Sequence, residues 1–166
     1  MELGTLALRS IAPTGLALRP VQPGDAPFLR LLHDELRGAE LDAWGWPDSA
    51  RQGFLAMQFQ AWSAAVAFSP DAVLVLEGGT AVGLLVLSER DGTRLLSEIA
   101  LSAAVRGRGY GTAILRALQA AGRPIALHVL HGSPAFRLYG RLGFLPTDDD
   151  GIRIGMFWSP ARGGTT

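Results

Sequence analysis

The chain is 166 residues long, with 48% hydrophobic and 18% charged residues, a length and balance that favour one globular domain over a disordered chain. It has no cysteine, which excludes disulfides, thiolate metal sites and a thiol nucleophile. All 15 basic residues are arginine, so sites that need a P-loop lysine or a Schiff-base lysine are excluded as well.

The three histidines, His33, His128 and His131, match no common zinc spacing, so we expect no metal. The start of the chain lacks a basic region followed by an apolar run, and no apolar stretch reaches the roughly 20 residues of a membrane span. The sequence therefore predicts a cytoplasmic protein with no membrane partner.

The net charge is zero, but charge is distributed unevenly along the chain. The segment from Ile99 to Thr147 holds six of the arginines and no acidic residue. A basic half in a neutral chain favours an anionic ligand on that half.

The first part of the chain predicts a strand and two helices. Leu16–Arg19 is the strand candidate. Apolar residues at helical spacing predict one helix with Asp25 as its N-cap and Gly38 at its end. A second helix is predicted with Asp48 as its N-cap, and its apolar pattern runs to Val66.

The middle of the chain predicts three strands. Apolar runs at 72–76 and 81–87 flank Gly78-Gly79 and predict a β-hairpin. The turn residues Asp91-Gly92 then lead into a third strand over 95–102.

The last part predicts two helices and three strands after a glycine-rich loop. These elements are the loop Arg106–Gly111, a helix ending near Gly122, the strand Ile125–Leu130, a short helix capped by Ser133-Pro134 and ended by Gly143, and the strands Phe144-Leu145 and Ile152–Trp158. Antiparallel hairpins followed by a β-loop-helix-β unit predict a mixed α/β (α+β) sheet with helices on its faces. We expect one domain over residues 1–158 and a polar tail over 159–166.

The glycine-rich loop at residues 106–111 joins a predicted strand to a predicted helix. Glycines let backbone N–H groups converge, and a helix N-terminus adds positive potential, so the loop suits a pyrophosphate. A Rossmann fingerprint would need glycine where the chain has Thr112, and an acid about 20 residues further on. The next acid after Glu98 is Asp148, which excludes the Rossmann interpretation.

Two segments together carry a resemblance to a known family. The pattern R-x-x-G-x-G at 106–111 follows the strand Glu98–Leu101, and Ser133–Phe144 is similar to the stretch N-x-x-A-x-x-L-Y-x-x-x-G-F. In this order they resemble the motifs of the GNAT N-acetyltransferase superfamily. Two positions depart from the family pattern: Gly132-Ser133 stands where many members have asparagine, and Tyr110 stands where an aliphatic residue is usual.

The resemblance implies a GNAT-like fold, with an about seven-stranded, mostly antiparallel sheet, a central parallel β-loop-α-β pair and four helices. It also implies acetyl-CoA as the co-substrate, with no metal. Strand backbone would pair with the pantetheine, and loop amides would bind the pyrophosphate with help from Arg106. The residues implied in cofactor binding are Ile99, Ala100, Leu101, Arg106, Gly107, Arg108, Gly109, Tyr110, Gly111, Thr112, Ser133 and Phe136.

The implied reaction is direct transfer of acetyl to an amine, because a chain without cysteine cannot form a thiol acetyl-enzyme. Tyr139, at the family position near the sulfur, would protonate the leaving thiolate. Glu98 is the candidate proton acceptor, since it is the acid near the strand end where the thioester would lie. A water chain and His131 are the alternatives, and His128 is expected in the core.

The acceptor pocket of the family is built in the region that holds Trp44, Trp46, Gln58 and Trp62. Trp62 lies at helical spacing and is expected to pack, whereas Trp44 and Trp46 lie in a loop and are pocket candidates. The segment Asp25–Phe68 holds six acids against three arginines. An acidic cleft attracts cations, which predicts a cationic small-molecule or peptide amine as acceptor.

The alternative function is a GNAT-like module that binds acyl-CoA without turnover. The presence of both Tyr139 and Glu98 favours the enzyme. Nucleic-acid binding is not expected, because the chain has zero net charge and little aromatic interleaving among its arginines. The sequence leaves open whether the protein is a monomer or a homodimer.

Overall fold

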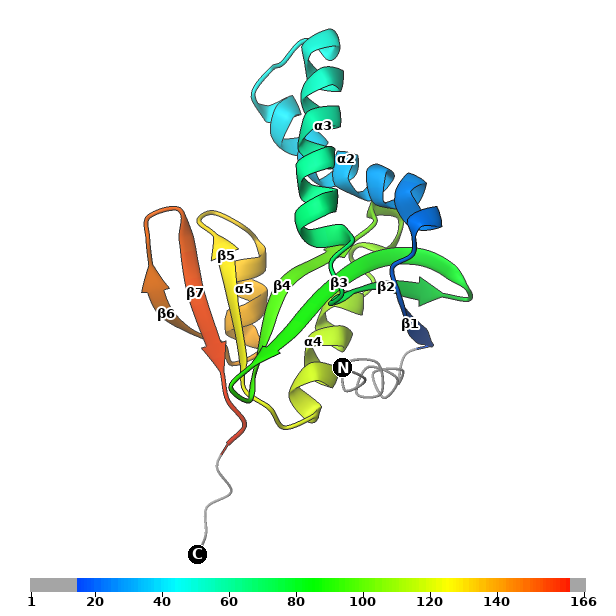
Figure 1. Ribbon diagram of the computed structural model, residues 1–166. Coiled ribbons are helices and arrows are strands. Elements are labelled where there is room, and N and C mark those ends of the chain that lie inside the picture. Colours follow the sequence, from blue (N-terminus) through cyan, green and yellow to red (C-terminus); the bar gives the residue numbers. More distant parts are fainter. Residues whose placement is uncertain (1–14, 162–166) are drawn as a thin grey trace, which may run out of the picture. The chain divides into compact units, whose positions relative to one another are not determined.

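The computed structural model describes residues 15–161, and residues 1–14 and 162–166 lie outside the described range (Figure 1). Residues 159–161 follow the last strand without regular structure, and the rest of the predicted tail is not described. The elements are β1 (Leu16–Pro20), α2 (Ala26–Ala43), α3 (Asp48–Trp62) with a π-helical turn (Ser63–Ala67), β2 (Ala72–Glu77), β3 (Thr80–Arg90), β4 (Thr93–Leu101), α4 (Tyr110–Ala120), β5 (Ile125–Leu130), α5 (Ala135–Arg141), β6 (Leu145–Asp149) and β7 (Arg153–Trp158).

Within residues 15–161, seven strands form one sheet in the order β1-β2-β3-β4-β5-β7-β6, accompanied by four α-helices. Strands β4 and β5 are parallel. The pairs β1–β2, β2–β3, β5–β7 and β6–β7 are antiparallel. The predicted fold class and the predicted order of elements are confirmed.

Two predicted helix boundaries are wrong. Helix α2 continues through Gly38 to Ala43. A Cβ at Gly38 would lie 2.8 Å from Nη2 of Arg51, so this glycine makes room for an arginine of α3 instead of ending α2. The N-cap of α3 is Pro47, and Asp48 is the first helical residue, where its charge meets the positive end of the helix dipole.

The chain divides into two compact units. We call residues 15–86 together with 98–108 the N-terminal unit, and residues 87–97 together with the chain from 109 onward the C-terminal unit. Strands β3 and β4 each contribute to both units. The expectation of one domain over residues 1–158 stays a prediction.

The core of the N-terminal unit forms where α2 covers strands. Leu29 and Leu32 of α2 are fully buried and share one cluster with Leu74 of β2, Leu84 of β3 and Ala100 of β4. Full burial of one leucine side chain contributes roughly 1.5–3 kcal/mol to stability. This cluster therefore anchors α2 on the strands and fixes the position of the end of β4.

Strands β3 and β4 approach each other closely at Gly83. A Cβ at this position would lie 2.6 Å from the carbonyl oxygen of Ala100 and 2.8 Å from Cδ2 of Leu101. Real Cβ atoms do not come so near to backbone. Glycine is therefore required for the close approach of these two strands.

Strand β5 is an inner strand of the sheet. It pairs with β4 on one side and with β7 on the other. Ile125, Leu127 and Val129 are buried, whereas His128 and Leu130 are exposed. This period of two places one face of β5 in the core and the other face at the surface.

Candidate active site

The glycine-rich loop has the backbone conformation that its glycines permit. Gly107 and Gly109 have φ angles of 76° and 81°, in the left-handed region that glycine adopts without strain. Gly109 is the N-cap of α4, and its carbonyl accepts a hydrogen bond from the N–H of Ala113 at 3.0 Å. The first N–H groups of a helix have no intrahelical acceptor. Those of residues 110–112 are among the amides of residues 107–112 that the family resemblance implies as donors to a pyrophosphate.

Both arginines of the loop make contacts within the N-terminal unit. Arg106 donates from Nε to the carbonyl of Leu101 at 3.0 Å. Arg108 donates from its two terminal nitrogens to the carboxylate of Glu77 on β2, at 3.0 and 3.3 Å. These contacts hold the loop against the ends of β4 and β2. A role of either guanidinium toward phosphate stays a prediction.

The predicted cofactor strand is the last part of β4. Ala100 is buried in the core cluster, and Ile99 and Leu101 are half-buried. The strand conformation agrees with the sequence prediction. Pairing of its backbone with pantetheine amides stays a prediction.

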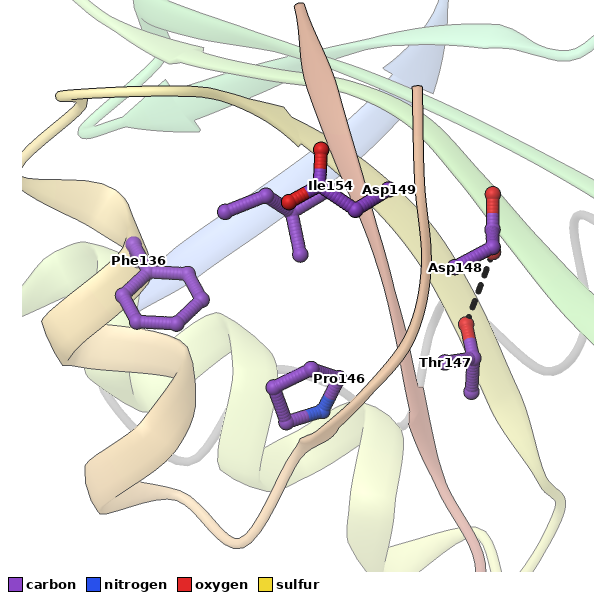
Figure 2. Close-up of a pocket in the computed structure, with 6 residues that line it drawn as sticks. All are labelled: Phe136, Pro146, Thr147, Asp148, Asp149 and Ile154. Carbon is purple, nitrogen blue, oxygen red and sulfur yellow. Dashed lines mark hydrogen bonds between the residues drawn. The ribbon is translucent and has the colours of Figure 1, made fainter. Parts of the chain in front are cut away.

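Phe136 borders a cavity of about 320 Å³ in the C-terminal unit. Figure 2 shows Phe136 of α5 facing Pro146 of β6, while Thr147 and Asp148 lie away from it. All lining residues come from α5, β6 and β7. The implied cofactor contact of Phe136 stays a prediction.

Tyr139 lies in the middle of α5 and is 6% exposed. Its ring packs on the ring of Phe144, with 5.7 Å between the centroids. At the start of the same helix, the hydroxyl of Ser133 accepts a hydrogen bond from the N–H of Ala135 at 3.3 Å. A buried tyrosine is compatible both with a packing role and with a general acid in a site that excludes water. The role of Tyr139 therefore stays a prediction.

Glu98 is a partly buried carboxylate of β4 in the N-terminal unit. Burial raises the pKa of the Glu98 carboxyl above its usual value. The hydrogen bond that Trp62 Nε1 donates to Glu98 Oε2 at 3.5 Å, and the charge of Arg37, lower this pKa by less. A carboxylate with a raised pKa is better suited to accept a proton near neutral pH.

The indole of Trp62 is held in place by a buried histidine. His33 of α2 is 1% exposed, and its ring lies 5.3 Å from that of Trp62 and 5.7 Å from that of Phe59. Its Nδ1 lies 3.2 Å from Oδ1 of Asp34. Trp62, which the sequence predicted to be a packing residue, therefore both packs and donates a hydrogen bond to Glu98.

The two histidines of the C-terminal unit contact acids of β6. His128 is exposed, and its Nε2 lies 3.6 Å from Oδ2 of Asp148, so its predicted place in the core is wrong. Side chains alternate between the two faces of β5, and that of His128 lies on the exposed face. His131 Nε2 lies 2.6 Å from Oδ1 of Asp149, and this contact, with the N–H of Gly151, lowers the pKa of Asp149.

Gly155 of β7 makes the contact between His128 and β6 possible. It is the register partner of His128 on β5. A Cβ at Gly155 would overlap the carboxylate of Asp148, which therefore lies across β7 toward the histidine. This arrangement could not be predicted from the sequence, because it depends on a cross-strand register.

A second cavity, of about 170 Å³, lies between α2 and α3 in the N-terminal unit. It is lined by Arg37, Leu41, Trp44, Phe54 and Gln58. Trp44 and Gln58 were predicted from the sequence to lie in the acceptor region. Arg37 was missed, although it lies four residues after His33 and four before Leu41, on one face of α2.

Trp46 is not among the lining residues of this cavity. Its ring packs on Phe54, one of the lining residues, with 4.9 Å between the centroids. Trp44, in contrast, is 63% exposed and lies at the rim.

Three of the acids that predicted a cationic acceptor are paired with arginines of the same unit. Each pair has its carboxylate and guanidinium in direct contact, and they are Arg19–Asp25, Arg30–Asp34 and Arg51–Asp42. Glu35 accepts a hydrogen bond from the N–H of Ala103 at 2.9 Å. The side chain of Glu40 lies outside the described residues. The excess of acids in this segment is thus largely matched by local cations and donors.

The model of the acetyltransferase (GNAT) family matches residues 30–144. The chain belongs to this family. The match includes residues 30–43 of α2, all of α3, the glycine-rich loop and Tyr139. A search of curated proteins finds no match.

Solved structures with the same fold cover most of this chain. The PaiA N-acetyltransferase of Thermoplasma acidophilum, in complex with coenzyme A, is 14% identical with a TM-score of 0.63, covering 87% of this chain and 99% of its own. An acetyltransferase of Thermus thermophilus is 24% identical with a TM-score of 0.62, covering 87% and 97%. Arabidopsis thaliana Naa50, in complex with the bisubstrate analogue CoA-Ac-MVNAL, is 18% identical with a TM-score of 0.56, covering 89% and 100%.

Within residues 15–161, no three side chains of histidine, aspartate or glutamate lie together as metal ligands would. Among the helices of this range, none has the length and apolar character to cross a membrane.

Proposed function

We propose that this protein transfers an acetyl group from acetyl-CoA to the nitrogen of an amine acceptor. The observation that carries the proposal is membership of the acetyltransferase (GNAT) family over residues 30–144. Two neighbours by fold agree with it, since one was solved with coenzyme A and another with a CoA-acetyl-peptide analogue.

The glycine-rich loop supports binding of acetyl-CoA. The left-handed conformations of Gly107 and Gly109 precede the start of α4, and helix N-termini bind phosphate groups through backbone N–H donors. In our proposal the pyrophosphate lies on residues 107–112, and the pantetheine follows the end of β4.

The proposed chemistry is a direct displacement at the thioester. The ammonium of the acceptor first loses a proton, and the nitrogen lone pair then attacks the carbonyl carbon. A C–N bond forms, the C–S bond breaks, and the nitrogen loses its second proton. The thiolate takes one proton to become free CoA, so that one proton in total is released to solvent.

Two side chains carry the proton transfers in this proposal. Glu98, whose pKa is raised by burial, accepts the first proton from the acceptor amine. Tyr139 donates a proton to the thiolate and is reprotonated from the attacking nitrogen. His131 and a water chain are the alternatives to Glu98.

The acceptor is a small molecule or a peptide, and its reacting group arrives as an ammonium cation. The acids Asp25, Asp34 and Asp42 are engaged by arginines, so the cationic character in our proposal is that of the reacting amine itself. We further propose that the protein is located in the cytoplasm, forms a single domain over residues 1–158, and is a monomer or a homodimer.

Release of CoA across a panel of amines tests this function. A thiol reagent has no background from the protein, because the chain contains no cysteine. Acetyl-CoA-dependent thiol release with at least one amine is expected. Binding of acetyl-CoA with no thiol release from any amine would instead favour the alternative, a module that binds acyl-CoA without turnover.

The variant Tyr139→Phe tests the proposed acid. It keeps the ring that packs on Phe144 and removes only the hydroxyl. We expect unchanged acetyl-CoA affinity by calorimetry and a fall in kcat of about 10²–10⁴-fold. Unchanged kcat would assign Tyr139 to packing alone.

A further inference from the structure

Three rings from α2 and α3 pack together in the N-terminal unit and include the indole of Trp62. The imidazole of His33 lies 5.3 Å from the indole and 5.7 Å from the ring of Phe59, measured between centroids. The rings of Phe59 and Trp62 are 6.1 Å apart. All three distances are those of aromatic rings in contact. Because His33 is also buried, its ring restricts the orientations that the indole can take.

Two charged residues of α2 hold this ring cluster in place. Asp34 accepts two hydrogen bonds from Nε of Arg30, at 2.9 and 3.0 Å, and its Oδ1 lies 3.2 Å from Nδ1 of His33. The guanidinium carbon of Arg30 in turn lies 5.5 Å from the ring centroid of Phe59, a distance at which a cation is attracted to an aromatic face. These contacts form a closed circuit that joins the two helices and fixes the plane of the imidazole.

His33 contacts the indole through its ring and not through a hydrogen bond. Its Nδ1 faces Asp34, and its Nε2 is buried with no hydrogen-bond partner within residues 15–161. The contacts that the imidazole makes with α3 are therefore the ring contacts with Phe59 and Trp62. A different aromatic ring at this position should serve the same purpose.

The backbone after α3 also affects the orientation of Trp62. A π-helical turn follows directly over Ser63–Ala67, and the N–H of Phe68 donates to the carbonyl of Ser63 at 2.9 Å. Ala67 belongs to the core cluster, and Trp62 packs against the same cluster. At about 100° per residue, residues five apart lie on different faces of a regular α-helix, whereas a turn closed from i to i+5 brings them together. The turn thus keeps the indole on the core side.

The orientation of the indole matters because its N–H reaches Glu98. Trp62 Nε1 donates to Glu98 Oε2 at 3.5 Å, longer than the roughly 2.7–3.2 Å of a typical N–H···O bond. A small rotation of the indole would break so long a bond. The bond stabilises the charged carboxylate, so its loss would add to the rise that burial causes in the pKa of Glu98. The side chains that hold the indole therefore also influence the protonation of Glu98.

We propose that His33 is a positioning residue, whose ring keeps the indole N–H of Trp62 on the carboxylate of Glu98. For its effect on catalysis this inference rests on the proposed acetyl transfer, in which Glu98 accepts the proton of the acceptor amine. The contact itself needs no turnover and can be measured without it. Since His33 acts through Trp62, its effect should vanish when the indole is absent.

The direct test follows the indole N–H of Trp62 by NMR in protein with isotope-labelled tryptophan. The resonance is assigned by its absence from Trp62→Phe. In the wild type it should move with pH as Glu98 titrates, and this movement should be absent in Glu98→Gln. In His33→Ala, which removes the ring, we expect the movement to be lost. A wild-type resonance that does not respond to Glu98, or an unchanged response in His33→Ala, would overturn the inference.

Two control variants separate positioning from general damage. Leu41→Ala shortens another buried side chain of α2, so it should lower stability but keep the pH response of the indole. His33→Phe places a ring beside Phe59 and Trp62 again and should also keep the response. A response lost in Leu41→Ala as well would assign His33 to general packing. A response lost in His33→Phe would contradict a role of the ring.

Kinetics connect the contact to catalysis and distinguish this inference from the proposed function. The ascending limb of the pH profile of kcat/KM should move to higher pH in His33→Ala, as in Trp62→Phe. The double variant should move it no further than Trp62→Phe does, and a further displacement would overturn the inference. If no amine releases CoA, the proposed function fails, while the NMR response still decides the role of His33.

Discussion

Glu98 in the N-terminal unit and Asp149 in the C-terminal unit are both carboxylates beside a side-chain nitrogen, yet their pKa values shift in opposite directions. Burial raises the pKa of Glu98 despite the hydrogen bond from Trp62. Asp149 is exposed, and the contact with His131 lowers its pKa. Where water is excluded, desolvation outweighs a long hydrogen bond, and where water is present the short hydrogen bond prevails.

The comparison decides which acid is suited to proton transfer. A base works best when its pKa lies near the working pH. Glu98 is shifted toward that range and Asp149 away from it. The pair of His131 and Asp149 is better understood as a contact that holds β6, an edge strand, against the end of β5.

The substitution with the largest expected effect is Glu98→Gln. Glutamine keeps the shape and can still accept a hydrogen bond from Trp62, but it cannot take a proton. We expect kcat to fall by about 10²–10⁴-fold at unchanged acetyl-CoA affinity. The matched substitution Asp149→Asn should change kcat by no more than about twofold. A larger loss in Asp149→Asn than in Glu98→Gln would reverse the assignment of the two acids.

Two glycines extend the comparison to stability. A Cβ at Gly83 meets the backbone carbonyl of Ala100, which cannot move aside, so Gly83→Ala should cost about 1–3 kcal/mol of unfolding free energy. At Gly155 the obstacle is the exposed side chains of Asp148 and Thr147, which can rotate away. Gly155→Ala should therefore cost less than about 1 kcal/mol. Urea unfolding of both variants measures the difference, and equal losses would contradict it.

A smaller effect is expected from Trp62→Phe. The indole N–H stabilises the charged form of Glu98, and its removal raises the pKa further. Since only the deprotonated carboxylate accepts a proton, the ascending limb of kcat/KM should move to higher pH. Trp46→Phe serves as the control, because Trp46 packs on Phe54 in a different part of the helix pair. A limb that moves to lower pH, or equally in both variants, would argue against the Trp62–Glu98 contact.

The sequence predicted those features of the fold and of the site that depend on local patterns of residues. Hydrophobic periodicity predicts the order of strands and helices. Turn-forming residues predict the turn at Gly78-Gly79, and a family motif predicts the loop at residues 106–111. The end of α2 was predicted wrongly, because a glycine after an apolar helical pattern usually ends a helix. Gly38 instead lies within α2 and leaves room for Arg51 to pack against the helix.

The parts of the site that sequence could not predict are contacts between distant segments. The bond from Trp62 to Glu98 joins residues 36 positions apart. His128 is exposed because its side chain lies on the face of β5 that the core does not cover. The carboxylate of Asp148 can approach His128 only because Gly155, on the strand between them, has no side chain. Arg37 has an ordinary place in a helical pattern, and its position in the lining of the cavity depends on α3 packing beside α2.

The pH dependence of kcat/KM for CoA release tests the central claim most directly, measured with one amine acceptor for the wild type, Glu98→Gln and His131→Gln. We expect an ascending limb in the wild type and in His131→Gln, at a pH above the usual range of a glutamate. The same limb should be absent in Glu98→Gln. An ascending limb that persists in Glu98→Gln and is lost in His131→Gln would contradict the account and place the proton acceptor in the C-terminal unit.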